Sequence, residues 1–173
     1  HVTKYIKNEE PLDDIPLVVL KSDKSKKVDL KKISPIKVKK IRVNSSKQNI
    51  KKVRKEVNLI AQDMGFSSSD TFNLKLAVNE AQANIIEHAY QGSDKGDILF
   101  YFYIYSDRLE IIVKDFGMGT KPIPIKDENH LDELEGSGLG VYLIKTLVDN
   151  VEYKRIEKVG TELKLIKYLI KEG

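Results

Sequence analysis

Three polar side chains at four-residue intervals are the first sign of chemistry in this sequence. Glu80, Asn84 and His88 lie within the stretch NEAQANIIEHAY, which begins at Asn79. Because residues four apart lie on the same side of a helix, this spacing places a carboxylate, an amide and an imidazole on one helical face. Such a face either performs chemistry or is a solvated polar surface, depending on what the rest of the chain brings to it.

A second motif with chemical potential is the segment DFGMG at 115–119. Alternating apolar residues before it predict a strand that ends at Asp115. A carboxylate at a strand end can accept a hydrogen bond from an exocyclic amine such as that of adenine. Gly117 and Gly119 let the backbone approach a ligand closely.

A third motif, GSGLG at 136–140, precedes a predicted helix. It consists of Gly136, Ser137, Gly138, Leu139 and Gly140. Free backbone amides at a helix N-terminus form a site for anions such as phosphates. The motif is not a Walker A loop, because the Gly-Lys-Ser/Thr ending is missing, and no strand precedes it as in a Rossmann fingerprint. A structural glycine-rich turn is the alternative.

The helix that must carry Glu80 and Asn84 is predicted by apolar residues at three- and four-residue spacing from about Phe72 to Tyr90. The segment SSSD at 67–70 predicts its N-terminal cap. The stripe consists of Leu74, Ala77, Val78, Ala81, Ile85 and Ala89.

The remaining patterns predict the elements around these motifs. In chain order they are a strand over 35–43, a helix over 47–64 capped by the segment 44–46, the helix described above, a hairpin over 98–114, a loop over 117–135, a helix over 139–149, and strands over 151–157 and 161–169. This order predicts an α+β fold, a two-layer α/β sandwich with a mainly antiparallel mixed sheet and helices on one face.

Length and composition set the domain organisation. The chain has 173 residues, of which 40% are hydrophobic, and no cysteine, which excludes disulfides and thiolate chemistry. No apolar run approaches the roughly 20 residues that span a bilayer, and no secretory signal is visible, so we expect a soluble, cytoplasmic protein. We predict an N-terminal extension or linker over 1–33, where the segment 15–20 (IPLVVL) could form a strand, and one domain over 34–173.

Charge is distributed unevenly along the chain. Residues 1–57 hold 17 Lys and Arg against 7 Asp and Glu, while residues 58–173 hold 13 against 19. A basic segment of this kind can contact an acidic protein or nucleic acid. The basic residues are scattered, without an interleaved aromatic platform or a DNA-binding helix pair, so we expect no direct nucleic-acid binding.

The order of the motifs resembles the Bergerat-type ATP-binding fold of histidine kinases, type II topoisomerases and mismatch-repair ATPases. That order is ExxxN on a helix, DxGxG after a hairpin, a polar loop, GxGLG at the start of a helix, and Gly160-Thr161 at the last strand. The resemblance covers about residues 36–170. The sequences of the motifs NEAxxNIIEHAY and GSGLGVYLIKTLVD are most similar to those of the anti-sigma-factor serine/threonine kinases of bacterial partner-switching systems.

This resemblance implies a role for each motif. Asn84 would hold Mg²⁺ and Glu80 would be the general base for phosphoryl transfer from ATP. Asp115 would bind the adenine amine, in a pocket shaped by Gly117 and Gly119. The other implied nucleotide contacts are phosphate wrapping by the segment 136–140, with Gly136, Gly138 and Gly140 as its glycines, and assistance at the adenine edge by Thr161. His88 either lies near phosphate or packs against the loop.

The resemblance also implies protein partners. The chain would bind a sigma factor and phosphorylate an anti-sigma antagonist, and it would form a homodimer. Arg54, on the predicted helix over 47–64, would help to grip the partner; the alternative is a solvated arginine.

Three other functions remain open. The ATP-binding domain of a histidine kinase or multidomain regulator would need a phosphoacceptor histidine on an upstream helix pair, and the three histidines are His1, His88 and His130. A non-catalytic interaction module would not need both Glu80 and Asn84. A topoisomerase- or mismatch-repair-like ATPase would need a transducer domain after this one.

Overall fold

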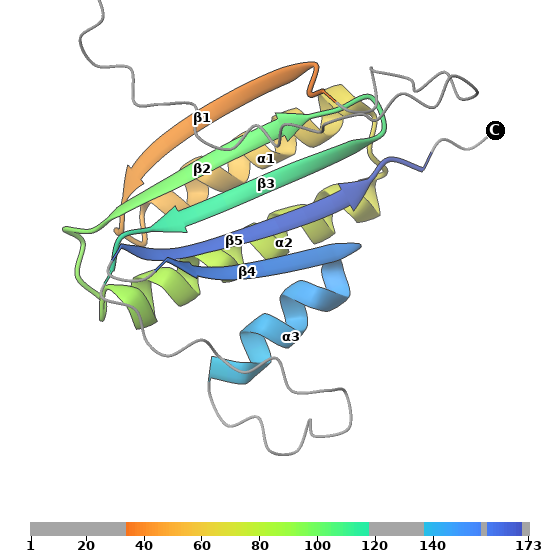
Figure 1. Cartoon of the computed structure of the whole chain (residues 1–173). Helices are drawn as coiled ribbons and strands as arrows, with labels where there is room; N and C mark the ends of the chain where they lie inside the picture. The colour runs from red at the N-terminus through yellow and green to blue at the C-terminus, as the bar shows by residue number, and fades with distance from the viewer. Residues whose placement is uncertain (1–33, 118–136, 157–158, 171–173) are drawn as a thin grey trace, which may run out of the picture.

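Five strands form one antiparallel sheet. The computed structural model describes residues 34–117, 137–156 and 159–170. In Figure 1 the strand order is β1-β2-β3-β5-β4. The strands are β1 (Lys37–Asn44), β2 (Asp97–Ile104), β3 (Arg108–Asp115), β4 (Asn150–Ile156) and β5 (Gly160–Tyr168). All four pairings are antiparallel, so the described strands contain no parallel pair, and the predicted mixed sheet is antiparallel throughout this part.

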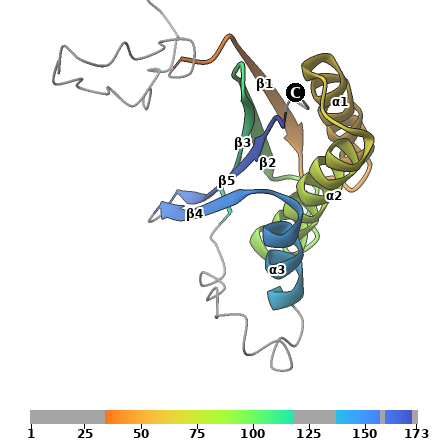
Figure 2. The ribbon, with the colours of Figure 1, turned by 90° about the vertical axis from the view of Figure 1, so that its right-hand side faces the viewer.

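Three α-helices lie on one face of this sheet, as Figure 2 shows. They are α1 (Asn49–Met64), α2 (Ser68–Asn84) and α3 (Ser137–Leu147). The predicted α+β sandwich of two layers is therefore confirmed. Among the described residues, no helix is long and apolar enough to cross a membrane.

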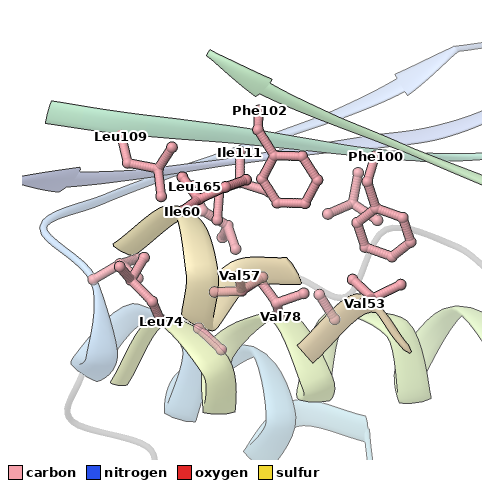
Figure 3. Close-up of a cluster of buried hydrophobic side chains, with 14 of the residues drawn as sticks. Val53, Val57, Ile60, Leu74, Val78, Phe100, Phe102, Leu109, Ile111 and Leu165 are labelled. Carbon is pink, nitrogen blue, oxygen red and sulfur yellow. The ribbon is translucent and has the colours of Figure 1, made fainter. Parts of the chain in front are cut away.

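The core lies between the sheet and helices α1 and α2 (Figure 3). Alternate residues of β2 and β3 point into it, as the predicted hairpin requires, because successive strand residues face opposite sides. Fully buried members include Val53, Val57, Val78, Phe100, Phe102, Leu109 and Ile111. Burial of each such side chain contributes about 1.5–3 kcal/mol to stability, which makes this core the support for the helix that carries Glu80 and Asn84.

The start of α1 differs from the sequence prediction. Its N-cap is Gln48, with no side-chain hydrogen bond, rather than a residue of the segment 44–46. Ser45 is 1% exposed, and its hydroxyl instead accepts a hydrogen bond from the Gly96 amide (2.9 Å) and donates to the Ser93 carbonyl. The serine therefore ties the end of β1 to the loop before β2, a long-range use that local capping rules do not reveal.

The long helix of the opening motif has the predicted cap but ends differently. Ser67 caps α2 by accepting the Asp70 amide (3.0 Å). After Asn84 the α-helix becomes a short π-helix, η2 (Ile85–Ala89), in which the Tyr90 amide donates to the Ile85 carbonyl (3.1 Å). One wide turn leaves the spacing of apolar residues almost unchanged, so periodicity predicted an α-helix to Tyr90. Short π-helical turns occur frequently at functional sites.

Several sequence predictions lie outside the described residues. These are the possible strand over 15–20, almost all of the polar loop over 117–135, and the extension over 1–33. The proposed domain boundary near residue 34 therefore stays a prediction.

Candidate functional site

The acid–amide pair of α2 lies directly against the start of α3. Glu80 and Asn84 are half-buried, one helical turn apart. A Cβ added to Gly140 would overlap Oε1 of Glu80 and would lie 2.8 Å from Nδ2 of Asn84. Only a glycine lets these side chains lie so close to the α3 backbone. The first and third motifs of the sequence thus meet in space, as the resemblance implies.

The first turn of α3, for which the sequence predicts anion binding, begins beside this pair. Ser137, Gly138 and Leu139 form the first turn, followed by Gly140. The first amides of a helix have no partner within the helix, and the helix dipole favours negative charge near them. A polyphosphate bound there would lie next to Glu80 and Asn84. Gly136 and Gly119 are outside the described residues.

Asp115 ends β3 as a buried carboxylate with ordered partners. It is 2% exposed, and the antiparallel pairing of β3 with β5 places it opposite Thr161 of β5. The Thr161 hydroxyl donates to one carboxylate oxygen, and the Gly117 amide donates to the other at 2.9 Å. The structure therefore brings together three predicted adenine-site residues, Asp115, Gly117 and Thr161.

Burial raises the pKa of Asp115 above its ordinary value of 3.8, although the hydrogen bonds from Thr161 and Gly117 partly offset the shift. Desolvation disfavours the charged form, whereas donors stabilise it. A buried carboxylate has more acceptor sites than these two donors use, so it is suited to a ligand that donates a further hydrogen bond, such as an exocyclic amine.

Two close backbone approaches fix where the Asp115 strand end lies. A Cβ on Gly160, whose φ is +138°, would overlap the Asp115 carbonyl oxygen. A Cβ on Gly117 would lie 2.5 Å from the Ala89 carbonyl oxygen. Glycine at both positions lets β5 on one side, and the end of the α2–η2 helix on the other, contact the residues around Asp115.

Two predicted site residues belong neither to the group around Gly140 nor to the group around Asp115. His88 lies on η2 and is half-buried, and the structure leaves its role open. Arg54 is exposed on α1. Its exposure agrees both with partner contact and with a solvated arginine.

Sequence reasoning assigned no site role to two residues of this region, Tyr90 and Tyr153, and it did not foresee the contact that Gly160 makes. Tyr153 lies on β4 and is 40% exposed. Its partial burial raises its pKa, the nearby Asp115 charge acts in the same direction, and a hydrogen bond with Thr161 opposes the shift. The Tyr90 hydroxyl contacts the strand end after Asp115. Gly160 appeared in the ordered motifs, but its contact with Asp115 depends on strand pairing that no local pattern reveals.

The residues present fit a magnesium nucleotide better than a protein-held metal. No group of three acidic or histidine side chains able to hold a metal occurs in the described segments. Mg²⁺ commonly takes one or two protein oxygen ligands and completes its shell with phosphates and water. The Asn84 amide oxygen, beside the glycine cradle of α3, matches that need.

The match to known families agrees with this geometry. The family model described as histidine kinase-like ATPase domain matches residues 43–167. A crystal structure of RsbU and RsbW domains from Mycobacterium tuberculosis has a TM-score of 0.56 and 17% identity, covering 77% of this chain and 32% of the other. That likeness concerns the fold. The chain thus contains a histidine kinase-like ATPase domain.

Relatives in the genus Bacillus assign the chain to a more specific family. The serine-protein kinase RsbW of Bacillus mycoides is 37% identical over 120 residues, covering 65% of this chain and 73% of that protein. RsbW of Bacillus licheniformis is 37% identical over 127 residues, covering 69% and 78%. The chain belongs to the family of RsbW serine-protein kinases.

The Gly140 contact leads to a first expected result. Gly140→Ala should strongly lower the rate of the reaction catalysed at this site, because the new methyl group displaces the carboxylate of Glu80. The protein should stay folded, because the flexible end of the Glu80 side chain can move away from the methyl group. In an unobstructed helix interior, Gly→Ala would stabilise the chain by about 1 kcal/mol. Thermal unfolding and steady-state kinetics of the variant measure the two effects separately.

A matched background provides the control for Gly140→Ala. In a Glu80→Ala chain the methyl group meets less obstruction, so the same substitution should raise the melting temperature more than it does in the wild type. Equal shifts in both backgrounds, together with unchanged kinetics, would mean that Gly140 and Glu80 are not in contact.

The buried charge of Asp115 leads to a second expected result, on stability. Its folded-state pKa lies above the unfolded value, so folding binds a proton between the two, and stability falls as the pH rises through this window. Asp115→Asn removes the buried charge, and the Thr161 hydroxyl can reverse to accept from the new amide. Without nucleotide, the variant should melt higher than wild type at pH 7, by a margin that shrinks toward pH 3.8.

The same variant should bind ATP more weakly, because the amide offers the adenine amine a poorer acceptor. Calorimetric scans over pH and an ATP titration provide the measurements, with Asp94→Asn on the exposed loop as control. A variant that melts lower than wild type at pH 7 would show that the ionised carboxylate stabilises the empty fold.

Proposed function

We propose that this chain is an ATP-dependent serine/threonine kinase that acts as an anti-sigma factor in a bacterial partner-switching system. It binds a sigma factor in one state and phosphorylates a serine or threonine of an anti-sigma antagonist. The observation that carries the proposal is the contact of Gly140 with Glu80 and Asn84, which places an acid and an amide beside the phosphate-binding turn of α3.

Glu80 has the role of general base in this proposal. The acceptor hydroxyl gives its proton to the carboxylate as its oxygen forms a bond to the γ-phosphorus of ATP. The bond from that phosphorus to the bridging oxygen breaks, and ADP leaves. A carboxylate beside the phosphate turn is positioned to orient the hydroxyl for in-line attack.

Asn84 holds Mg²⁺ through its amide oxygen in this proposal. When bound, the ion neutralises charge on the β- and γ-phosphates. The half-buried position of Asn84, one turn from Glu80 and against Gly140, supports the assignment. In this proposal the amides of the segment 137–140, with Gly136 before them, bind the phosphate oxygens. His88 either lies near these phosphates or packs against the loop.

Asp115 accepts a hydrogen bond from the adenine amine, with Thr161 at the adenine edge and the glycines at 117 and 119 shaping the pocket. The support is the buried carboxylate that already accepts from Thr161 and Gly117. A buried polar acceptor discriminates strongly against ligands that leave it unpaired, so this position would select adenine.

The partners follow from the family. The sigma factor and the antagonist are proteins, and we propose that the exposed Arg54 on α1 contacts one of them. We also propose that the chain forms a homodimer, makes no direct contact with nucleic acid, and works in the cytoplasm.

Incubation with γ-labelled ATP, Mg²⁺ and a candidate antagonist tests the function. Stable label on a serine or threonine of the antagonist supports the kinase assignment. Acid-labile label on this chain itself would instead indicate phosphohistidine and the histidine-kinase alternative. Absence of transfer to any antagonist encoded beside the chain's own gene, with ATP bound, would contradict kinase activity and favour a sequestering module.

A further inference from the structure

We propose that Tyr90 is a positioning residue for nucleotide recognition. Its hydroxyl holds the turn after Asp115 in a set position relative to the helix that carries Glu80 and Asn84. This inference rests on the proposed function, because it assigns to Asp115 the reading of the adenine amine.

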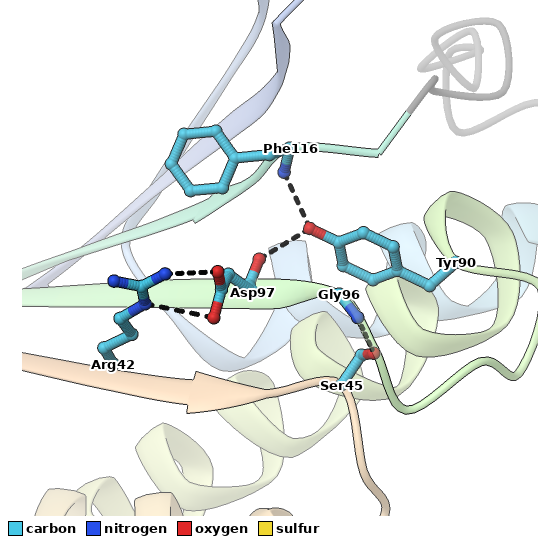
Figure 4. Close-up of polar contacts among 6 residues, drawn as sticks. All are labelled: Arg42, Ser45, Tyr90, Gly96, Asp97 and Phe116. Carbon is cyan, nitrogen blue, oxygen red and sulfur yellow. Dashed lines mark hydrogen bonds and ion pairs between the residues drawn. The ribbon is translucent and has the colours of Figure 1, made fainter.

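Both hydrogen-bonding capacities of the Tyr90 hydroxyl are used, as Figure 4 shows. It accepts from the Phe116 amide at 2.8 Å and donates to the Asp97 carbonyl at 2.6 Å. Phe116 directly follows Asp115, whereas Asp97 begins β2. One phenol thus joins the end of β3 to the start of β2 from the end of the helix.

The tyrosine ring is itself held in place. A Cβ on Gly96 would overlap the ring, so the ring lies flush against the backbone at that glycine. Gly96 is fixed in turn by Ser45, whose amide donates to the Gly96 carbonyl (2.8 Å) and whose hydroxyl accepts from the Gly96 amide (2.9 Å). The ring that carries the Tyr90 hydroxyl is therefore supported by the loop before β2, which Ser45 joins to the end of β1.

A second contact joins the same two elements. Gly117 lies against the carbonyl group of Ala89, which is the residue before Tyr90. The turn over 115–117 is therefore attached to the helix end at Gly117 and at Phe116. Since η2 continues directly from Asn84, this attachment sets the distance between the adenine end and the phosphate end of the proposed site.

The burial of Tyr90 favours a hydroxyl that keeps its proton. Burial raises its pKa, the nearby carboxylates of Asp115 and Asp97 act in the same direction, and the backbone hydrogen bonds oppose the shift. The hydroxyl therefore remains a donor to Asp97 throughout the physiological pH range. Removal of the oxygen would leave the Phe116 amide and the Asp97 carbonyl without this partner.

Tyr90→Phe removes this oxygen and keeps the ring. The test compares the affinity for ATP with that for the ATP analogue that has hydrogen in place of the 6-amino group. The variant should lose about five- to fiftyfold in affinity for ATP, as expected for disturbance of one buried hydrogen bond, and much less for the analogue. KM for ATP should rise accordingly while kcat at saturation stays near that of wild type.

The ratio of the two affinities isolates the positioning effect. Partial unfolding would lower the active fraction equally for both nucleotides and leave their ratio unchanged. Tyr103→Phe, on the sheet face away from the helices, is the matched control and should leave the ratio as in wild type.

Two results would overturn the inference. If wild type discriminates between the nucleotides and Tyr90→Phe discriminates equally well, Tyr90 does not position Asp115, while the proposed function stands. If wild type itself does not discriminate, Asp115 does not read the amine, and this part of the proposed function fails together with the inference.

Discussion

Replacement of Glu80 by glutamine should reduce phosphoryl transfer to the antagonist by about 10²- to 10⁴-fold, the usual contribution of a general base. Glutamine has nearly the same shape and cannot take the proton of the acceptor hydroxyl. The cradle formed by Gly140 should still accommodate it, so affinity for Mg-ATP should change little. Single-turnover transfer and calorimetric titration measure the two quantities.

Glu87→Gln is the matched control, because Glu87 is exposed and lies about two turns further along the same continuous helix. It should transfer phosphate at the wild-type rate. If Glu80→Gln transfers phosphate as fast as wild type, the base assignment is wrong. If it instead loses ATP binding, Glu80 serves binding rather than the transfer step.

Truncation of Asn84 to alanine should weaken the binding of Mg-ATP itself. One lost interaction with a charged group costs about 1.5–3 kcal/mol, which corresponds to roughly a ten- to hundredfold loss of affinity. The effect should be large for ATP with Mg²⁺ and small for ATP with EDTA, because the amide oxygen acts on the ion. Calorimetry with and without Mg²⁺ gives both values.

Asn73→Ala, on the same helix, is the control and should bind both forms of ATP as wild type does. Stability should be measured in parallel, because truncation in a half-buried position costs some packing. Equal affinity of Asn84→Ala and wild type for Mg-ATP would rule out the metal-ligand role.

Much of the fold could be predicted because its elements obey local rules. Ile98, Phe100 and Phe102 alternate along β2, and one face of a strand must be buried. Ser67 accepts the amide of Asp70, as an N-cap does. These patterns repeat at the period of the element itself, so neither depends on which distant segment packs against it.

The exceptions arise where a residue is used by a distant segment. Serine is a common helix N-cap, yet the Ser45 hydroxyl forms its hydrogen bonds with the loop at Ser93 and Gly96 instead. The π-helix after Asn84 likewise lies where the helix end contacts the turn of Gly117. In both cases the local pattern does not reveal a contact that only the tertiary structure forms.

The order and the sequences of the motifs were enough to identify the family, because a nucleotide site needs an acid–amide helix face, a strand-end carboxylate and a glycine turn. Tertiary structure decided how they meet. Gly140 lies on Glu80 and Asn84, Thr161 donates to Asp115, and Tyr90 fastens the strand end to the helix. The physical reason is that local periodicity depends on neighbours in sequence, whereas these contacts depend on the packing of distant segments. Asp115 and Thr161 are 46 residues apart, and Tyr90 and Phe116 are 26 apart.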